Sequence, residues 1–238
     1  PALVAGNPAE GGEILIAVWD DGSVTALSGH VDLGTGIRTA LAQIVAEELH
    51  VPMARLEMVL GHTNATPNQG PTIASASIQI SAAPLRRAAA QAREQLLARA
   101  ARQWGVAADT LRLRDGIVRP ADERDERALR YGQLVQGQHT RLELAADDSQ
   151  VRLKPAGEYT LVGSAVARVD IPAKATGALT FVHDVRVPGM RHGRVVRPPY
   201  PGRDGGDFDR MGLHVGSSGT GTGPVSGCWR RRPMRCLS

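Results

Sequence analysis

Two glycines stand where a strand-like stretch gives way to a helix-like one, and this junction constrains the fold more than any other part of the sequence. Residues 13–29 are rich in β-formers, and Asp21-Gly22 in their middle is the signal of a two-residue hairpin turn. The second half of this predicted hairpin leads directly to Gly34 and Gly36. The sequence therefore predicts a β-hairpin, a tight glycine turn and then a helix.

The helix predicted after the glycine turn covers residues 37–49. Its apolar residues recur at helical spacing, while Arg38, Glu47 and Glu48 are predicted to face solvent. Glu47 and Glu48 could also be offered as an acid–base pair. Neighbouring residues on a helix point about 100° apart, and we interpret both carboxylates as solvated.

Further elements follow from the same patterns. A second helix is predicted from Pro84 to the stop residue Gly105, with its arginines facing solvent. The other predicted elements are a strand at 56–60, a loop at 62–72, a hairpin around Asp115-Gly116, a short helix at 131–135, and strand-like sequence at 178–199 with a turn at 187–190.

Charge and cysteine content exclude several classes of protein. The net charge is +4, but residues 191–238 carry nine Arg against three Asp (+6), which leaves −2 for the first 190 residues. No basic face accompanies the predicted fold, which argues against nucleic-acid binding. The two cysteines, Cys228 and Cys236, are too few for an iron–sulfur cluster and fit no zinc signature. No apolar run approaches the roughly 18 residues of a membrane span, and the N-terminal residues resemble no signal peptide.

Two loops are the candidate binding elements. At the glycine turn, the first N–H groups of the following helix lack partners within the helix, and together with the helix dipole they suit phosphate or metal-oxo oxygens. The second loop, "TPNQGPTIASAS", brings the hydroxyls of Thr72, Ser75 and Ser77 within six residues. Each loop has a plainer interpretation, a tight turn in the first case and a solvated loop with a helix N-cap in the second.

Histidines do not form a metal site in this interpretation. His30, His62, His183 and His192 lie on different predicted elements and share no ligand spacing. We expect them to be surface or hydrogen-bonded side chains. Neutral hydroxyls and amides suit an anionic, heteroatom-rich cofactor better than a bare metal ion.

A long stretch of the chain resembles a known family. Residues 31–77, which contain "VDLGTGIRTALAQIVAEEL" and "TPNQGPTIASAS", resemble the molybdenum-cofactor-binding region of the large subunit of molybdenum hydroxylases, the xanthine dehydrogenase/aldehyde oxidase family. The branch is that of nicotinate dehydrogenase-like and isoquinoline oxidoreductase-like proteins. Residues 161–199 resemble the lead-in to the α/β hammerhead domain of the family.

The resemblance implies which residues hold the cofactor. Leu33, Gly34, Thr35 and Gly36 would line the molybdenum and its dithiolene, and Thr72, Ser75 and Ser77 would bind the pterin. Thr35 stands where the family more often has Gln, and its short hydroxyl cannot copy the reach of an amide. The cofactor would be molybdopterin, as such or as the cytosine dinucleotide.

The resemblance also implies the activity and the partners. The whole enzyme would hydroxylate an aldehyde or an N-heteroaromatic carbon and pass electrons to a 2Fe–2S small subunit, with a cytochrome c subunit or domain as a further partner. The Glu that serves the family as general base has no match in this chain, so no catalytic residue is predicted here. The location would be cytoplasmic, or alternatively the periplasmic face of the inner membrane.

The predicted fold class is α+β, with β-hairpins packed against two main helices. The predicted domains are a partial cofactor-binding domain (12–145), a linker (146–165), the start of a hammerhead domain (166–202) and a disordered tail (203–238). Because the Arg/Gly/Ser-rich tail stops resembling the family, we hypothesise that the chain is a frameshifted fragment.

Two other functions stay open at this stage. One is a non-catalytic fragment that serves as a structural or partner-binding piece, and the other is an unrelated anion-binding module.

Overall fold

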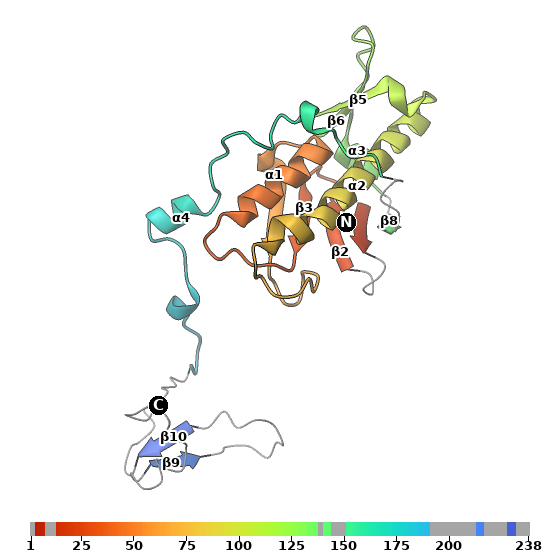
Figure 1. Ribbon diagram of the computed structural model, residues 1–238. Helices are drawn as coiled ribbons and strands as arrows, with labels where there is room; N and C mark the ends of the chain where they lie inside the picture. Colours follow the sequence, from red (N-terminus) through yellow and green to blue (C-terminus); the bar gives the residue numbers. More distant parts are fainter. Residues whose placement is uncertain are drawn as a thin grey trace. The chain divides into compact units, whose positions relative to one another are not determined.

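The computed structural model describes residues 3–7, 13–137, 140–143, 151–190, 213–216 and 228–231 (Figure 1). It divides into two compact units, residues 1–176 and 177–238. The candidate loops both lie in the first unit. The domain boundaries proposed from the sequence stay predictions.

The first unit contains eight strands and four α-helices within the described residues. Its strands are β1 (Leu3–Asn7), β2 (Glu13–Val18), β3 (Val24–Ser28), β4 (Leu56–Leu60), β5 (Leu111–Arg114), β6 (Ile117–Pro120), β7 (Leu129–Arg130) and β8 (Thr140–Glu143). Its helices are α1 (Ile37–Leu49), α2 (Ala82–Trp104), α3 (Tyr131–Val135) and α4 (Ile171–Ala175). A π-helical turn, Ser77–Ser81, precedes α2.

The main sheet has five strands in the order β4-β3-β2-β1-β8, and β5, β6 and β7 form a second, three-stranded sheet. The central strands β1, β2 and β3 pair antiparallel, while β4 joins β3 and β8 joins β1 in parallel. This mixture of helices and small sheets agrees with the predicted α+β class at that level. The predicted elements at 37–49, 56–60 and 131–135 have the predicted bounds, and the hairpin at Asp115-Gly116 is also confirmed.

The first hairpin has a longer turn than the sequence predicted. Trp19 N–H donates to the Ser23 carbonyl at 2.9 Å, so the loop has three residues, Asp20 to Gly22, instead of two. Gly22 takes a left-handed conformation (φ 82°), as three-residue hairpin loops require. The Asp21 carboxylate accepts the Ser23 N–H at 2.8 Å, which holds this wider form.

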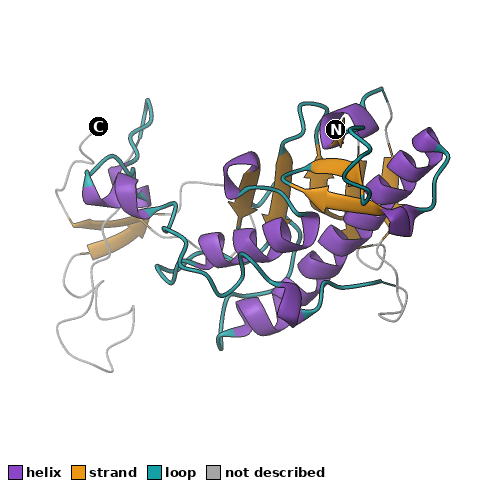
Figure 2. Ribbon diagram, turned by 90° about the horizontal axis from the view of Figure 1, so that it is seen from above, coloured by secondary structure: helices purple, strands orange, loops and turns teal. Residues whose placement is uncertain are grey.

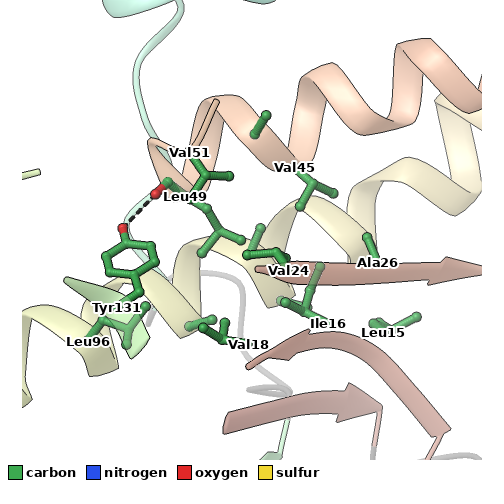
Figure 3. Packing of buried hydrophobic residues seen from close by; sticks show 14 of the residues in the cluster. Leu15, Ile16, Val18, Val24, Ala26, Val45, Leu49, Val51, Leu96 and Tyr131 are labelled. Atoms are coloured by element: carbon green, nitrogen blue, oxygen red, sulfur yellow. Dashed lines mark hydrogen bonds between the residues drawn. The ribbon is translucent and has the colours of Figure 1, made fainter. Parts of the chain in front are cut away.

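Helices α1 and α2 pack against each other and against the main sheet (Figures 1 and 2). A run of small residues on α2, including Ala88, Ala89 and Ala92, is fully buried and allows close approach of its backbone. The largest fully buried apolar side chains come from β2, β3, β6, α1, α2 and α3: Ile16, Val18, Val24, Leu41, Val45, Leu49, Leu85, Leu96, Val118 and Tyr131. Figure 3 shows part of this core. It forms the rigid platform from which the two candidate loops project.

Two predictions about the second unit need correction. Residues 178–190 form no strand; they contain a single 3-10 turn, Val182–Asp184, and the predicted turn at 187–190, closed by Met190 N–H donating to the Val187 carbonyl. A strand needs a neighbour to pair its backbone groups, and none of the described strands pairs with this segment. Residues 191–199 lie outside the described residues.

In the predicted disordered tail, the structure describes two short strands, β9 (Leu213–Gly216) and β10 (Cys228–Arg231). They pair antiparallel, so the prediction of disorder is wrong for these two segments. The remainder of residues 203–238 lies outside the described residues.

One buried hydrogen bond ties α3 to the end of α1 and can be tested. The Tyr131 hydroxyl, on a fully buried side chain, donates to the Leu49 carbonyl at 2.6 Å (Figure 3). Tyr131→Phe leaves this carbonyl unpaired and should lower the free energy of unfolding by about 1–2 kcal/mol. Tyr159→Phe is the matched control, because the Tyr159 ring lies against Arg86 and no described residue hydrogen-bonds its hydroxyl. Urea denaturation measures both, and equal effects would contradict the prediction.

Candidate cofactor-binding site

The two loops singled out from the sequence lie side by side and are joined by hydrogen bonds. Val31 N–H, just before the glycine turn, donates to the Thr72 hydroxyl at 2.9 Å. The Gln69 side-chain oxygen accepts the Gly29 N–H at 2.8 Å and the Ser28 hydroxyl at 2.9 Å. A Cβ at Gly29 would lie 2.0 Å from the Pro67 carbonyl oxygen, so only glycine permits this approach. The end of β3 and the Thr/Ser loop therefore form one surface.

The glycine turn differs from expectation in one respect. The Asp32 carboxylate accepts the N–H groups of Gly34 (2.9 Å), Gly36 (3.2 Å) and Arg38 (3.2 Å). Partial burial works against the ionised form of Asp32, but these N–H groups outweigh it and lower the pKa of the carboxyl. Amides that the sequence left open to a ligand are thus capped by a side chain of the chain itself. The spacing Asp-x-Gly, which is typical of such turns, was the signal that could have predicted this cap.

Both glycines of the turn are required by its geometry. Gly34 has φ 96° and Gly36 has φ 79°, in the region that side chains with a Cβ rarely adopt. Nothing lies within 4 Å of the position of a Cβ at Gly34, so a ligand can approach the backbone there. Leu33 and Thr35 beside it are exposed, Leu33 by 71%.

The Thr/Ser loop contains two strained residues. Ala74 (φ 49°) and Ser75 (φ 57°) both take left-handed conformations in a turn closed by Ala76 N–H donating to the Ile73 carbonyl at 3.0 Å. The sequence allowed Thr72 and Ser75 to lie on the first turn of one helix, but these left-handed conformations show that they do not. Left-handed non-glycine residues are energetically costly and occur disproportionately at binding sites. Ser75 is exposed, and its hydroxyl makes no hydrogen bond to any residue that the structure describes.

Ser77, the third hydroxyl of the set, is engaged with His30. The His30 ring is 2% exposed; its Nδ1 lies 2.7 Å from the Ser77 hydroxyl, and its Nε2 lies 3.1 Å from the Ser81 hydroxyl. This confirms His30 as a hydrogen-bonded histidine. Among the described residues no group of three or more His, Cys, Asp or Glu side chains could hold a metal ion. His192 lies outside the described residues.

The largest departure from the sequence analysis concerns Glu47 and Glu48, which are buried, with residue exposures of 3% and 1%. The Glu48 carboxylate is paired with Arg86 Nε at 2.7 Å and Arg93 Nη1 at 2.6 Å. Lys154 Nζ lies 2.5 Å from Glu47. The prediction that Glu47 and Glu48 face solvent is therefore wrong, and so is the prediction that Arg93 on α2 is exposed. Residues 151–170 cover all three side chains.

We call residues 151–170 the strap. Three side chains of α1, spaced four residues apart, bind the backbone of the strap. The strap and α1 run in opposite directions. Thr39 accepts the Val169 N–H (3.2 Å), Gln43 donates to the Leu161 carbonyl (2.9 Å), and Glu47 accepts three consecutive strap N–H groups. These last three belong to Thr160, Leu161 and Val162, at 3.0, 2.6 and 2.8 Å.

The strap ends at the glycine turn. Arg168 Nη1 donates to the Gly34 carbonyl at 3.2 Å, and a Cβ at Gly36 would lie 2.9 Å from Arg168 Nε. Asp170 holds the guanidinium through Nε (3.0 Å) and Nη2 (2.7 Å). Arg168 is separated from the turn by more than 130 residues, so no local pattern could have revealed this contact.

The structure also contains two pockets away from the paired loops. One, of about 680 Å³, lies on the β5–β6 hairpin and the charged loop after it, and the other, of about 290 Å³, lies between α1, α2 and the strap. The larger pocket is lined by both acidic and basic side chains and by none of the candidate cofactor-binding residues. None of the candidate cofactor-binding residues lines either of these two pockets.

Residues 3–185 match the family model described as the molybdopterin cofactor-binding domain. The chain belongs to this family. The match includes the glycine turn, the Thr/Ser loop and the strap, so the surface described above belongs to a molybdopterin-binding domain of the molybdenum hydroxylase large subunits. No helix among the described residues combines the length and the apolar character needed to cross a membrane.

Curated relatives of this molybdopterin-binding domain are named as parts of larger enzymes. The chain is 56% identical over 195 residues to a nicotinate dehydrogenase component of Pseudomonas putida, in an alignment that covers 82% of the chain and 16% of that protein. It is 31% identical over 239 residues to an isoquinoline 1-oxidoreductase component of Brevundimonas diminuta, in an alignment that covers 85% of the chain and 30% of that protein. The chain thus spans less than a third of the length of either relative.

Among solved structures, the chain is similar to CO dehydrogenase from Oligotropha carboxidovorans, with a TM-score of 0.45 and 27% identity over 50% of the chain and 15% of that protein.

Because the Glu47 carboxylate is buried and paired, we expect the free energy of unfolding to fall as the pH is lowered. Burial opposes its ionisation, but Lys154 and the strap N–H groups outweigh burial and lower the pKa from 4.5 to about 2. A carboxyl with a lowered pKa in the folded state contributes stability above pH 4.5, and this contribution is lost as the pH falls toward about 2.

Glu47→Gln should remove this pH-dependent contribution to stability. Because the variant leaves Lys154 buried without its counter-charge, its free energy of unfolding at pH 7 should be lower by about 3–5 kcal/mol. Glu57→Gln is the control, because Glu57 is the exposed residue of β4. Urea denaturation from pH 7 to pH 3 provides the comparison. A wild-type stability that stays constant over this range would contradict the assignment.

Proposed function

We propose that this chain supplies part of the molybdopterin site of a molybdenum hydroxylase large subunit, through Leu33, Gly34, Thr35, Gly36, Thr72, Ser75 and Ser77. The observation that supports the proposal is the hydrogen bond from Val31 N–H to the Thr72 hydroxyl, which joins the start of the glycine turn to the Thr/Ser loop.

The chemistry of this surface fits the cofactor. The hydroxyls of Thr35 and Ser75 are exposed and unengaged by the described residues, so both can donate to or accept from pterin nitrogens and oxygens. The space at Gly34 allows close approach. Leu33 and Ile73, exposed by 71% and 62%, offer apolar surface to a flat ring system. Ser77, fixed by His30, offers the third hydroxyl.

The bound cofactor would supply the redox chemistry, and the residues of this chain would bind and orient it. Asp32 keeps the glycine turn rigid, and the strap holds the turn in place at the start of α1. The Glu that would act as general base is not predicted in this chain, so we assign no catalytic residue to it.

The substrate class is proposed from the names of the relatives, and the partners and the location are proposed from the resemblance of the sequence to the family. Relatives named for nicotinate dehydrogenase and isoquinoline oxidoreductase favour an N-heteroaromatic substrate, with an aldehyde as the alternative. A 2Fe–2S small subunit, and a cytochrome c subunit or domain, would carry the electrons. The cofactor would be molybdopterin or its cytosine dinucleotide, and the location cytoplasmic or on the periplasmic face of the inner membrane.

A second candidate function is a purely structural or partner-binding piece. The capping of the turn favours it, because Asp32 satisfies three N–H groups and Arg168 satisfies the Gly34 carbonyl without any ligand.

Ser75→Ala distinguishes the two functions. The Ser75 hydroxyl has no partner among the described residues, so the variant should keep the wild-type melting temperature. Its affinity for molybdopterin should fall about tenfold, as expected for the loss of one hydrogen bond of about 1.4 kcal/mol. The measurement is the pterin and molybdenum content of the chain purified from a host that makes the cofactor.

Thr63→Ala is the matched control, since Thr63 is an exposed hydroxyl of the neighbouring loop that we place outside the site. Wild-type chain that purifies without pterin would contradict the cofactor proposal and support the structural one.

A further inference from the structure

Arg168 has unused hydrogen-bonding capacity at the glycine turn. A guanidinium carries five N–H bonds. Within the described residues Asp170 accepts two of them, at Nε and Nη2, and the Gly34 carbonyl accepts a third, at Nη1. One N–H on each of Nη1 and Nη2 therefore remains without an acceptor. The side chain is 33% exposed, so these two donors can reach a ligand.

The Arg168 guanidinium is held in a fixed orientation. Its paired bonds to the Asp170 carboxylate fix the plane of the group, and the bond from Nη1 to the Gly34 carbonyl fixes its position. The adjacent Val169 N–H donates to the Thr39 hydroxyl of α1, and this bond also holds the strap backbone against the helix. A planar donor pair that is already oriented loses little entropy when it binds an anion.

Charged side chains of both signs surround the Arg168 guanidinium. Lys174 Nζ lies 2.5 Å from the same Asp170 carboxylate, so two cations share one anion. Asp32 is the other nearby carboxylate, and its oxygens accept three backbone N–H groups at the positive end of the α1 dipole. Arg168, Asp170 and Lys174 together carry a net charge of +1, and the Asp32 carboxylate beside them carries −1.

We infer that Arg168 is an anion-binding residue of this site and contacts an oxyanion group of the ligand, a phosphate or a metal-oxo group, through its two remaining N–H bonds. The inference rests on the proposed function, because a molybdopterin ligand carries both kinds of oxyanion. It corrects the expectation from the sequence: the helix amides are capped by Asp32, and the anion donors come from the strap instead.

The test is a titration of the 238-residue chain with inorganic phosphate and, separately, with tungstate. The readout is the NMR signals of the Arg168 guanidinium and of the Gly34 and Gly36 amides. We expect saturable shifts with a dissociation constant on the order of millimolar for one of the two anions. Stronger binding of phosphate assigns the contact to the phosphate end of the ligand, and stronger binding of tungstate assigns it to the metal-oxo end.

Three variants accompany the titration. Arg168→Gln should weaken binding at least about tenfold, and Arg168→Lys, which keeps the charge but loses the planar donor pair, should lie between it and the wild type. Arg38→Gln is the control, since it removes an equal charge from an exposed side chain next to the same turn and should leave the affinity within about twofold. Melting temperatures of all variants show whether each is folded.

Two results would overturn the inference: no saturable shift at the Arg168 signals of the wild-type chain, or equal losses in the Arg168 and Arg38 variants. These outcomes are independent of the pterin content that tests the proposed function. A chain that binds phosphate through Arg168 but never purifies with pterin keeps the anion site and loses the molybdopterin assignment.

Discussion

The arrangement of the site depends on a carboxylate buried on α1. Glu47 binds Lys154 and three consecutive backbone N–H groups of the strap, so an irregular segment gains partners that a sheet or helix would otherwise provide. Glu48 beside it binds two arginines of α2. Because removal of one partner would leave a charge buried and unpaired, the strap is firmly fixed to the two helices.

The position of the strap decides what the glycine turn presents to a ligand. Backbone N–H groups at the start of α1 are occupied by Asp32, and the Gly34 carbonyl is occupied by Arg168. The turn therefore offers open space, an exposed hydroxyl on Thr35 and the edge of a guanidinium. Across from it, the Thr/Ser loop offers Ser75 from a strained turn, which the hydrogen bond between Val31 and Thr72 keeps in place. Neutral hydroxyls with one oriented cation suit a large anionic cofactor of the kind that this family binds.

Local patterns in the sequence predicted much of the fold, because hairpins and amphipathic helices depend on neighbouring residues. The helix at 37–49, the strand at 56–60 and the hairpin at Asp115-Gly116 were all found in this way. The same reasoning failed for Glu47, Glu48 and Arg93. Charged residues on one face of a helix indicate solvent unless another segment covers them. Here the covering residues lie more than 100 positions from Glu47 and Glu48, and 59 positions from Arg93. Residues 178–190 show the opposite error, since alternation predicts a strand only where a partner strand is present.

Amide hydrogen exchange of Thr160, Leu161 and Val162 measures whether Glu47 holds the strap, since their N–H groups should be bound to Glu47 whether or not a ligand is present. We expect exchange at least about 100-fold slower than in an unstructured chain, although these residues belong to no helix or strand. Exchange at the unstructured rate, with α1 and α2 still protected, would show that Glu47 does not fix the strap to α1.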